Sequence, residues 1–391
     1  MSTGTASTVQ PTDLAEARAA VLDTAGPLLF TGAGTKLRWG IPPDGIEVIV
    51  GTSAMTDVLA YDAADATVAV QAGARLADLQ RTLAEHDQWL AIDPPLVDRG
   101  ATVGGILASG DAGPRRVAHG TMRDLVIGAT YVLADGAIGR TGGFVIKNVA
   151  GYDMAKLLCG SLGTLALVAE VVLRVHPRAQ TSATLQVPAD AATAARVAAT
   201  IGTAPVEPSA FEWADETVWI RFSGHDDAVR AQIARTAALL DDRRGDADEV
   251  TDADEAATWR RLTEDLAGVE GETVVRGGCL PSHLPDAARS CAVAADEAGV
   301  DVALQATVPL GVLTARVRGG DAADHATFVD AWRGRLAARG GHAVVRRTAP
   351  GVAEVVDVWG PPPSAIGLMQ RVKQELDPDG RCAPGRFVGG M

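Results

Sequence analysis

Residues 98–136 read DRGATVGGILASGDAGPRRVAHGTMRDLVIGATYVLADG, and the interpretation of the whole chain begins with them. Glycine occurs in this stretch at positions 100, 104, 105, 110, 113, 120 and 128, and again at its end, 136. Glycine weakens helices and strands, so this density predicts positive φ angles or a backbone that closely approaches a ligand. Val103, Ile106 and Leu107 lie between the glycines and favour a buried, ligand-facing turn over a surface loop. The stretch therefore predicts a site for a large, phosphate-bearing cofactor.

A second small-residue loop, Thr31–Lys36 (TGAGTK), follows a short predicted strand. Successive backbone amides in such a loop can converge on phosphate oxygens, although a plain β-turn is the alternative. The loop lacks the G-x-x-x-x-G-K-[ST] spacing of a P-loop. Leu37 occupies the third glycine position of the dinucleotide fingerprint G-x-G-x-x-G. Neither of those two cofactor-binding classes is favoured.

Composition and charge limit the class of protein. The chain has 391 residues, of which 47% are hydrophobic, and a formal net charge of −14. This length predicts two or three domains, and the negative charge argues against direct binding to nucleic acid or an anionic membrane. The N-terminal residues show no basic, apolar leader, and no apolar run is long enough to span a bilayer. We expect a cytoplasmic protein.

The cysteines and histidines argue against a metal centre built by this chain alone. Cys159, Cys279, Cys291 and Cys382 are far apart and form no C-x-x-C pair, and the seven histidines show no H-x-x-x-H spacing. We therefore predict no metal site. Redox chemistry would have to come from an organic cofactor.

The first part of the chain and the C-terminal tail are predicted to alternate short strands and helices. Strands are expected where β-branched residues lie between turn residues, and helices where apolar residues recur every three or four positions. Glu170 interrupts an apolar strand, which predicts either structural pairing or contact with the cofactor. The expected helices are Asp13–Ala25, 76–86, a short one ending at Leu158, and Ser364–Leu376 capped by Ser364; the strands are Pro27–Phe30, Glu47–Val50, Thr67–Ala72, Leu125–Leu133 and Leu165–Val175.

From Thr181 the chain has fewer glycines and repeats a β-α-β-β-α order. This order predicts one antiparallel sheet with helices on one face. The acidic run Asp241–Asp254 is interpreted as a solvated linker between the two repeats. The expected strands are Ala183–Val187, Ser209–Trp213, Thr217–Phe222, Thr273–Gly277, Asp301–Thr307, Leu313–Arg318 and Ala343–Arg347, and the helices are Ala191–Ile201, Asp226–Leu240, Ala287–Ala298 and Ala323–Ala338.

Taken together and in order, the motifs resemble those of the vanillyl-alcohol-oxidase/PCMH-type flavoproteins. They are TGAGTK, DPPLVDRGATVGGILASGDAGPRR, HGTMRD, GGFVIKNVAGYDMAKLLCGSLGTLALVAEVVLRVHP and DPDGRCAPGRF. Within that family they are most similar to FAD-binding E subunits of bacterial glycolate oxidases. The resemblance implies an α+β fold: a PCMH-type FAD-binding domain of two α+β subdomains plus an antiparallel-sheet α+β cap. It implies an FAD domain at 1–179, a cap with two β-α-β-type halves at 180–355, and a C-terminal segment, 356–391, that returns to the FAD domain.

The resemblance also implies which residues bind FAD. Gly32–Lys36 would form the first pyrophosphate loop, and the second glycine-rich stretch would follow the rest of the cofactor. No histidine or cysteine stands where some relatives attach flavin covalently, so we expect non-covalent FAD. The implied residues are Gly32, Ala33, Gly34, Thr35, Lys36, Pro94, Thr102, Val103, Gly104, Gly105, Ser109, Gly110, Gly113, Gly120, Asp124, Val168 and Glu170.

Activity and partners also follow only from the resemblance. It implies the FAD subunit of a complex that oxidises glycolate to glyoxylate, with a sister flavin subunit and an iron–sulfur subunit, peripheral to the inner membrane through those partners. The G-E-H-G-type histidine motif of the family's 2-hydroxy-acid dehydrogenases has no match after residue 180. A self-sufficient FAD dehydrogenase and a non-catalytic scaffold subunit are the two alternatives. Catalytic candidates for the self-sufficient enzyme are Arg115, Arg116, His119, Lys147, Tyr152 and Arg386.

Overall fold

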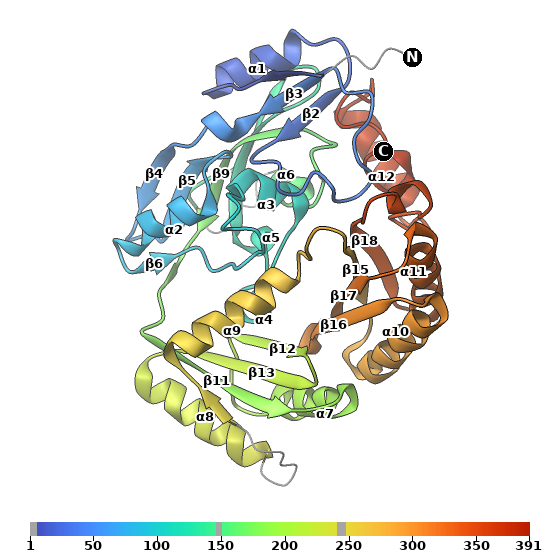
Figure 1. The fold of residues 1–391 in the computed structure, drawn as a ribbon. Coiled ribbons are helices and arrows are strands. Elements are labelled where there is room, and N and C mark those ends of the chain that lie inside the picture. The colour runs from blue at the N-terminus through green and yellow to red at the C-terminus, as the bar shows by residue number, and fades with distance from the viewer. Residues whose placement is uncertain (1–5, 146–150, 241–247) are drawn as a thin grey trace. The chain divides into compact units, whose positions relative to one another are not determined.

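The computed structural model describes residues 6–145, 151–240 and 248–391, which divide between two compact units (Figure 1). The first unit comprises the chain up to Ala112 together with Gly120–Arg178 and Pro361–Met391. The second comprises Gly113–His119 and Ala179–Gly360. The C-terminal segment therefore lies with the N-terminal unit. Residues 113–119 lie with the second unit, because Val117 packs against its hydrophobic core.

The first unit begins with a small parallel sheet in the order β1-β3-β2. Helix α1 (Leu14–Leu22) starts at Asp13, whose side chain accepts a hydrogen bond from the Glu16 backbone N–H. This bond satisfies one of the amides that a helix start leaves unpaired. The predicted positions of α1, β2 and β3 are confirmed, whereas strand β1 was not predicted. The strands are β1 (Ser7–Val9), β2 (Leu28–Thr31) and β3 (Val48–Gly51).

The second sheet of this unit is antiparallel and has the order β4-β5-β9-β7-β8. Its apolar face packs against α2 and α3, so alternate residues of β5 and β9 are completely buried. Strand β4 was not predicted from the sequence. The strands are β4 (Val58–Asp62), β5 (Thr67–Gln71), β7 (Val126–Val132), β8 (Ile138–Gly142) and β9 (Leu167–Arg174); β6 (Gln88–Trp89) pairs with β10 (His176–Pro177); the helices are α2 (Leu76–Ala84), α3 (Val103–Ser109), α5 (Met122–Leu125) and α6 (Met154–Leu158).

The glycine-rich stretch contains a helix, which corrects the sequence prediction of a turn. Gly104 and Gly105 lie inside α3, and neither has a positive φ angle. A Cβ at position 104 would lie 2.6 Å from Ala72 Cβ and 2.9 Å from the Ala72 carbonyl oxygen. Glycine is needed at 104 because helix α3 packs directly on the backbone that follows β5, not because of an unusual φ. Gly110 ends the helix in the left-handed conformation (φ 61°), as a C-terminal glycine commonly does.

The C-terminal segment is attached to the first unit through helix α12 (Ile366–Leu376) and the residues after it. Lys373 Nζ donates hydrogen bonds to the Thr164 carbonyl (2.6 Å) and to the Cys382 carbonyl (3.0 Å), and it pairs with Asp377 Oδ2 at 2.5 Å. Ser364 was predicted to cap this helix, but the helix begins at Ile366. Residues 363–366 first form a turn in which the Ile366 N–H donates to the Pro363 carbonyl.

The second unit is built on one antiparallel sheet in the order β14-β11-β13-β12-β16-β17-β15-β18. Helices α7, α8, α10 and α11 share one core with one face of this sheet. Strand β16 has the predicted bounds, and the other predicted elements agree within a few residues. The strands are β11 (Thr181–Pro188), β12 (Ala210–Ala214), β13 (Thr217–Gly224), β15 (Thr273–Gly278), β16 (Asp301–Thr307), β17 (Val312–Arg318) and β18 (His342–Arg347); the helices are α4 (Arg116–His119), α7 (Ala191–Gly202), α8 (Asp226–Leu240), α10 (Leu284–Ala298) and α11 (Ala322–Ala337).

The acidic run between the two halves of this unit is not a linker over its described part. It contains strand β14 (Asp248–Val250) and the start of helix α9 (Asp252–Asp265); residues 241–247 lie outside the described residues. Trp259 and Leu262 of α9 pack on the sheet face opposite the main core. The prediction of helices on only one face is therefore wrong. The acidic residues fit the first turn of α9, because the positive end of the helix dipole favours carboxylates there.

Candidate cofactor-binding site

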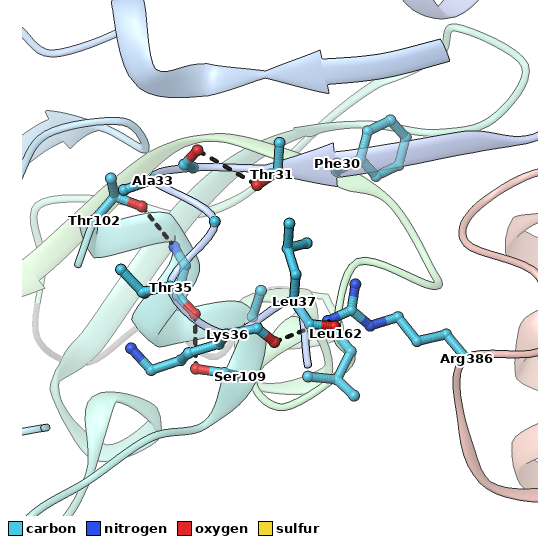
Figure 2. Close-up of a pocket in the computed structure, with 14 residues that line it drawn as sticks. Phe30, Thr31, Ala33, Thr35, Lys36, Leu37, Thr102, Ser109, Leu162 and Arg386 are labelled. Carbon is cyan, nitrogen blue, oxygen red and sulfur yellow. Dashed lines mark hydrogen bonds between the residues drawn. The ribbon is translucent and has the colours of Figure 1, made fainter. Parts of the chain in front are cut away.

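A narrow pocket of about 60 Å³ lies between the Thr31–Lys36 loop and helix α3. Figure 2 shows the loop passing over Thr102 and Ser109 of the glycine-rich stretch, with Leu162 and Arg386 at the other side. The two stretches that the sequence marked as cofactor loops are therefore neighbours in space. They are positioned by β2, which leads into the loop, and by α3, which packs on Ala72.

Close approach of the loop to α3 requires glycine at position 32. A Cβ there would lie 2.1 Å from Thr102 Oγ1. Thr102 Oγ1 also accepts a hydrogen bond from the Gly105 N–H at 3.2 Å and so caps α3. Gly34 has a φ of 71°, which turns the loop back toward Leu37. Two glycines therefore shape the loop. Any other residue would collide with Thr102 at position 32 or strain the backbone at position 34.

Backbone amides at the turn of this loop are available to a ligand. Within the described ranges, no residue accepts a hydrogen bond from the backbone N–H groups of residues 33–36. Consecutive unpaired N–H groups in a tight turn make a concave surface that attracts anions. A phosphate or diphosphate group fits this arrangement.

Lys36 adds a buried positive charge beside the loop. Its Nζ lies 3.3 Å from Asp111 Oδ2, and the two side chains are only 7% and 1% exposed. Among the described residues, neither Lys36 Nζ nor the Asp111 carboxylate oxygens make a well-aligned hydrogen bond. Buried charges without hydrogen bonds are unfavourable. A ligand with both acceptors and donors would satisfy them. Asp111 was missed at the sequence level, although it is the acidic residue directly after Gly110.

Arg386 reaches the pocket from the C-terminal segment (Figure 2). Its Nη2 donates to the Lys36 carbonyl at 3.1 Å and to the Leu37 carbonyl at 3.4 Å. Burial lowers the pKa of this guanidinium to about 10, so Arg386 remains charged at neutral pH. Arg386 was predicted as a catalytic candidate. In the structure it binds two carbonyl groups of this loop region, and its guanidinium, which has no acceptor, makes no bond that would occupy the loop N–H groups.

Other predicted cofactor residues of the first unit lie on neighbouring elements. Ser109 donates to the Gly105 carbonyl at 2.7 Å, and Asp124 accepts from the Thr121 N–H in a capping box after Gly120. Val103 and Pro94 are buried. Val168 is buried on β9. Glu170, two residues further along that strand, is half-buried.

The catalytic candidates are distributed over different parts of the chain. Arg115, Arg116 and His119 lie in the segment that joins the second unit, as does the predicted cofactor residue Gly113. Tyr152 is 91% exposed in the first unit. Lys147 lies outside the described residues.

A second polar cluster lies inside the second unit and was not predicted. Glu212 of β12 is fully buried, and its carboxylate accepts hydrogen bonds from Thr307 Oγ1 at 2.5 Å and Gln305 Nε2 at 3.0 Å. Burial raises the pKa of Glu212 to about 7, while these hydrogen bonds and the positive charges of Arg276 and Arg116 oppose the increase. Helix α4, which carries Arg116, packs against β12. A buried, titratable carboxyl group and one of the predicted catalytic arginines therefore lie on elements that pack together.

A family profile described as an FAD binding domain matches residues 5–153. These residues include both loops of the pocket. The match thus places the two loops of the pocket within a segment similar to FAD-binding domains. FAD is the cofactor, and the unpaired loop amides, the close approach at Gly32 and the buried Lys36 fit its diphosphate.

Several characterised or named proteins are similar in sequence. The glycolate oxidase subunit GlcE of Escherichia coli (strain K12) is 33% identical over 205 residues, which are 52% of this chain and 58% of that subunit. A D-lactate dehydrogenase of Archaeoglobus fulgidus is 36% identical over 41% of this chain and 36% of that enzyme. An uncharacterized FAD-linked oxidoreductase of Mycobacterium tuberculosis is 28% identical over 97% of this chain and 89% of its own length.

The glycolate oxidase subunits are matched over only part of their length: the chain spans 58% of GlcE and 34% of the subunit GlcD of Bacillus subtilis. Among solved structures, an alkyldihydroxyacetonephosphate synthase superposes with a TM-score of 0.72 over 96% of this chain and 76% of its own. At 17% identity this likeness shows the fold alone. It agrees with the predicted α+β fold of an FAD domain and an antiparallel cap.

The described residues also bear on membrane spans and metal binding. No helix there combines the length and the apolar character needed to cross a membrane. The same residues hold no cluster of three or more histidine, cysteine or carboxylate side chains arranged to ligate a metal ion.

Proposed function

We propose that the chain is the FAD-binding subunit of a 2-hydroxy-acid oxidising complex of the glycolate oxidase type. The observation that carries this proposal is the pocket itself: within the segment that matches an FAD-binding domain, the loop of residues 33–36 combines unpaired backbone amides with the buried Lys36 side chain. The similarity to glycolate oxidase subunits and to D-lactate dehydrogenases supports glycolate or D-lactate as substrate. A sister flavin subunit and an iron–sulfur subunit would receive the electrons.

Within this proposal, bound FAD supplies the two-electron acceptor for oxidation of a 2-hydroxy acid to a 2-oxo acid. The chain's own residues bind and orient it. The N–H groups of residues 33–36 donate to the diphosphate, and the Lys36 ammonium neutralises part of its charge. Arg386 fixes the loop from its carbonyl side. No histidine or cysteine is present in the Thr31–Lys36 loop, which supports non-covalent binding.

A self-sufficient dehydrogenase is the second candidate, and Arg116 is the observation in its favour. A guanidinium can bind a substrate carboxylate through two parallel hydrogen bonds. Arg116 lies in the electrostatic environment of Glu212, a carboxyl group able to hold or release a proton near neutral pH. A placed base of this kind contributes about 10²–10⁴-fold to proton transfer. This candidate requires no partner subunit.

Spectroscopy of the purified chain separates these functions. We expect a flavin absorption spectrum, with the colour released into the supernatant after acid precipitation. Colour retained in the pellet would contradict non-covalent binding, and a colourless chain that cannot be reconstituted with FAD would favour a scaffold.

Reduction by substrate is the second measurement. We expect anaerobic glycolate or D-lactate to bleach the isolated chain slowly or not at all, with dye reduction restored by the two partner subunits. Fast, stoichiometric bleaching of the chain alone would instead establish the self-sufficient dehydrogenase. Arg116→Ala would then be expected to raise KM for the hydroxy acid without loss of bound FAD.

A further inference from the structure

The two halves of the eight-stranded sheet in the second unit, β14-β11-β13-β12 and β16-β17-β15-β18, are joined by only a short pairing of β12 with β16. Strand β12 pairs with β16 at Trp213↔Ala306 and Ala214↔Gln305. Strand β16 pairs with β17 along its whole length, from Asp301 to Thr307. In the part of the chain that the structure describes, residues 301–304 thus pair with a strand on one side only. Their other side presents the open hydrogen-bonding edge that an added strand can use.

A groove of about 810 Å³ runs along this open edge. Its lining consists largely of small or flat apolar groups, so the space beside the strand is not filled by long side chains. Trp213 and the β12–β13 turn lie at one end, and the N-terminal residues of α7 border it. The apolar residues nearest the edge are Val302 and Leu304 of β16 and Ala288, Ala292 and Ala295 of α10.

The charges around the groove are predominantly negative. Five carboxylates line it, against two guanidinium groups. Both arginines already pair with carboxylates that do not line the groove: Arg289 with Asp286 at 3.0 Å and Arg318 with Glu272 at 3.5 Å. The lining carboxylates are Asp190, Asp215, Glu216, Asp296 and Asp301.

The five lining carboxylates differ in the partners that the described residues give them. Asp215 pairs with Arg261 at 2.8 Å, and Asp190 caps α7 through the Thr193 N–H. For Glu216, Asp296 and Asp301, by contrast, the described residues include no ion-pair partner. The groove therefore combines an open strand edge, an apolar floor and a net negative rim.

We propose that this groove binds an extended, lysine- or arginine-rich segment of a partner polypeptide, which adds as a strand beside β16. Main-chain hydrogen bonds to residues 301–304 would supply affinity, and alternate side chains would point to the acidic rim or the apolar floor. Positively charged side chains on the partner complement this rim, because its five carboxylates outnumber its two guanidinium groups. The site is separate from the cofactor pocket, which lies in the first unit.

Fluorescence anisotropy on the purified full-length chain tests this proposal. The probe is a fluorescein-labelled peptide of alternating lysine and valine with blocked ends. We expect saturable binding, no binding of the corresponding glutamate–valine peptide, and at least about tenfold weaker binding when the central valine is replaced by proline, which removes a backbone donor but no charge.

Charge-reversal variants locate the site. Asp296→Lys combined with Asp301→Lys should weaken binding of the lysine–valine peptide by at least about tenfold. Lysine at 296 is compatible with folding, because it lies near the C-terminus of α10 where a positive charge is favourable. Glu270→Lys is the matched control, since Glu270 is exposed and does not line the groove. The affinity of the Glu270→Lys variant for the lysine–valine peptide should stay within about twofold of that of the unmodified chain.

Hydrogen exchange distinguishes strand addition from charge attraction alone, because only strand addition protects backbone amides. We expect the peptide to slow exchange of backbone amides within residues 301–304. Equal binding of the valine and proline peptides, equal loss in the Glu270→Lys control, or unchanged exchange at 301–304 would overturn the proposal. A concentration-dependent dimer that Asp296→Lys disrupts would assign the groove to a second copy of the chain and would overturn it as well.

Discussion

Replacement of Glu212 by glutamine removes a carboxyl group that the fold keeps from ionising normally. Glu212 is completely buried, and burial raises its pKa from 4.5 to about 7. Glutamine has nearly the same shape and can still accept a hydrogen bond from Thr307. It cannot become charged. The substitution therefore isolates the contribution of ionisation to stability.

The magnitude follows from linkage between protonation and folding. At pH values below the unfolded pKa, Glu212 is protonated in both states and contributes no difference. As pH rises from the unfolded pKa to the folded pKa, Glu212 ionises in the unfolded chain but stays protonated in the folded chain. The free energy of unfolding therefore falls across this interval. The rise in the pKa of Glu212 from 4.5 to about 7 corresponds to about 3 kcal/mol. Between about pH 5.5 and about pH 8.5 the loss due to Glu212 is about 2 kcal/mol.

Urea denaturation at several pH values measures this effect. We expect the free energy of unfolding of the unmodified chain, minus that of Glu212→Gln, to fall by about 2 kcal/mol from the acidic to the alkaline end of this range. Other titrating groups are common to both proteins and cancel in the difference. Glu270→Gln, at an exposed position, is the control and should show a flat difference. A flat difference for Glu212→Gln as well would refute the assignment of a raised pKa to this residue.

Three further predictions concern the first unit. Gly104→Ala should lower the free energy of unfolding by about 1–3 kcal/mol in urea denaturation, because the new Cβ would overlap Ala72; unchanged stability would contradict the close packing. Thr102→Ala should lower it by about 1 kcal/mol through loss of the α3 cap, visible as a lower Tm. Lys373→Met should destabilise by about 3 kcal/mol or more, because Asp377 loses its buried partner, and limited proteolysis should then release the C-terminal segment. Lys373→Met combined with Asp377→Asn should recover part of that loss, and no recovery would argue against the pair.

Local sequence patterns determined the class of protein and most of its elements. Strand β16 lies at its predicted bounds, because alternating apolar residues and flanking turns reflect interactions within a few residues. The two glycine-containing loops were identified as a phosphate site for a similar reason. Small residues allow a close approach to the backbone, and this local property is visible in the sequence whether the approaching group is a ligand or another part of the chain.

Tertiary contacts decided which residues serve those loops and how. The sequence alone favoured a turn at Gly104 and Gly105, whereas packing of α3 on Ala72 makes the same glycines part of a helix. Arg386 reaches the carbonyl of Lys36 from the far end of the chain, and no local pattern relates the two.

Burial of charge likewise depended on the complete fold. Nothing near Glu212 in the sequence distinguishes it from an ordinary strand carboxylate, and its raised pKa results from burial among Thr307, Gln305 and the surrounding sheet. The open edge of β16 exists only because β12 diverges from it after two paired residues. The sequence by itself determined most of the elements and a phosphate-bearing cofactor, because those follow from short-range backbone preferences. The structure decided ionisation, partners and surfaces, because solvent exclusion and pairing are set by residues distant along the chain.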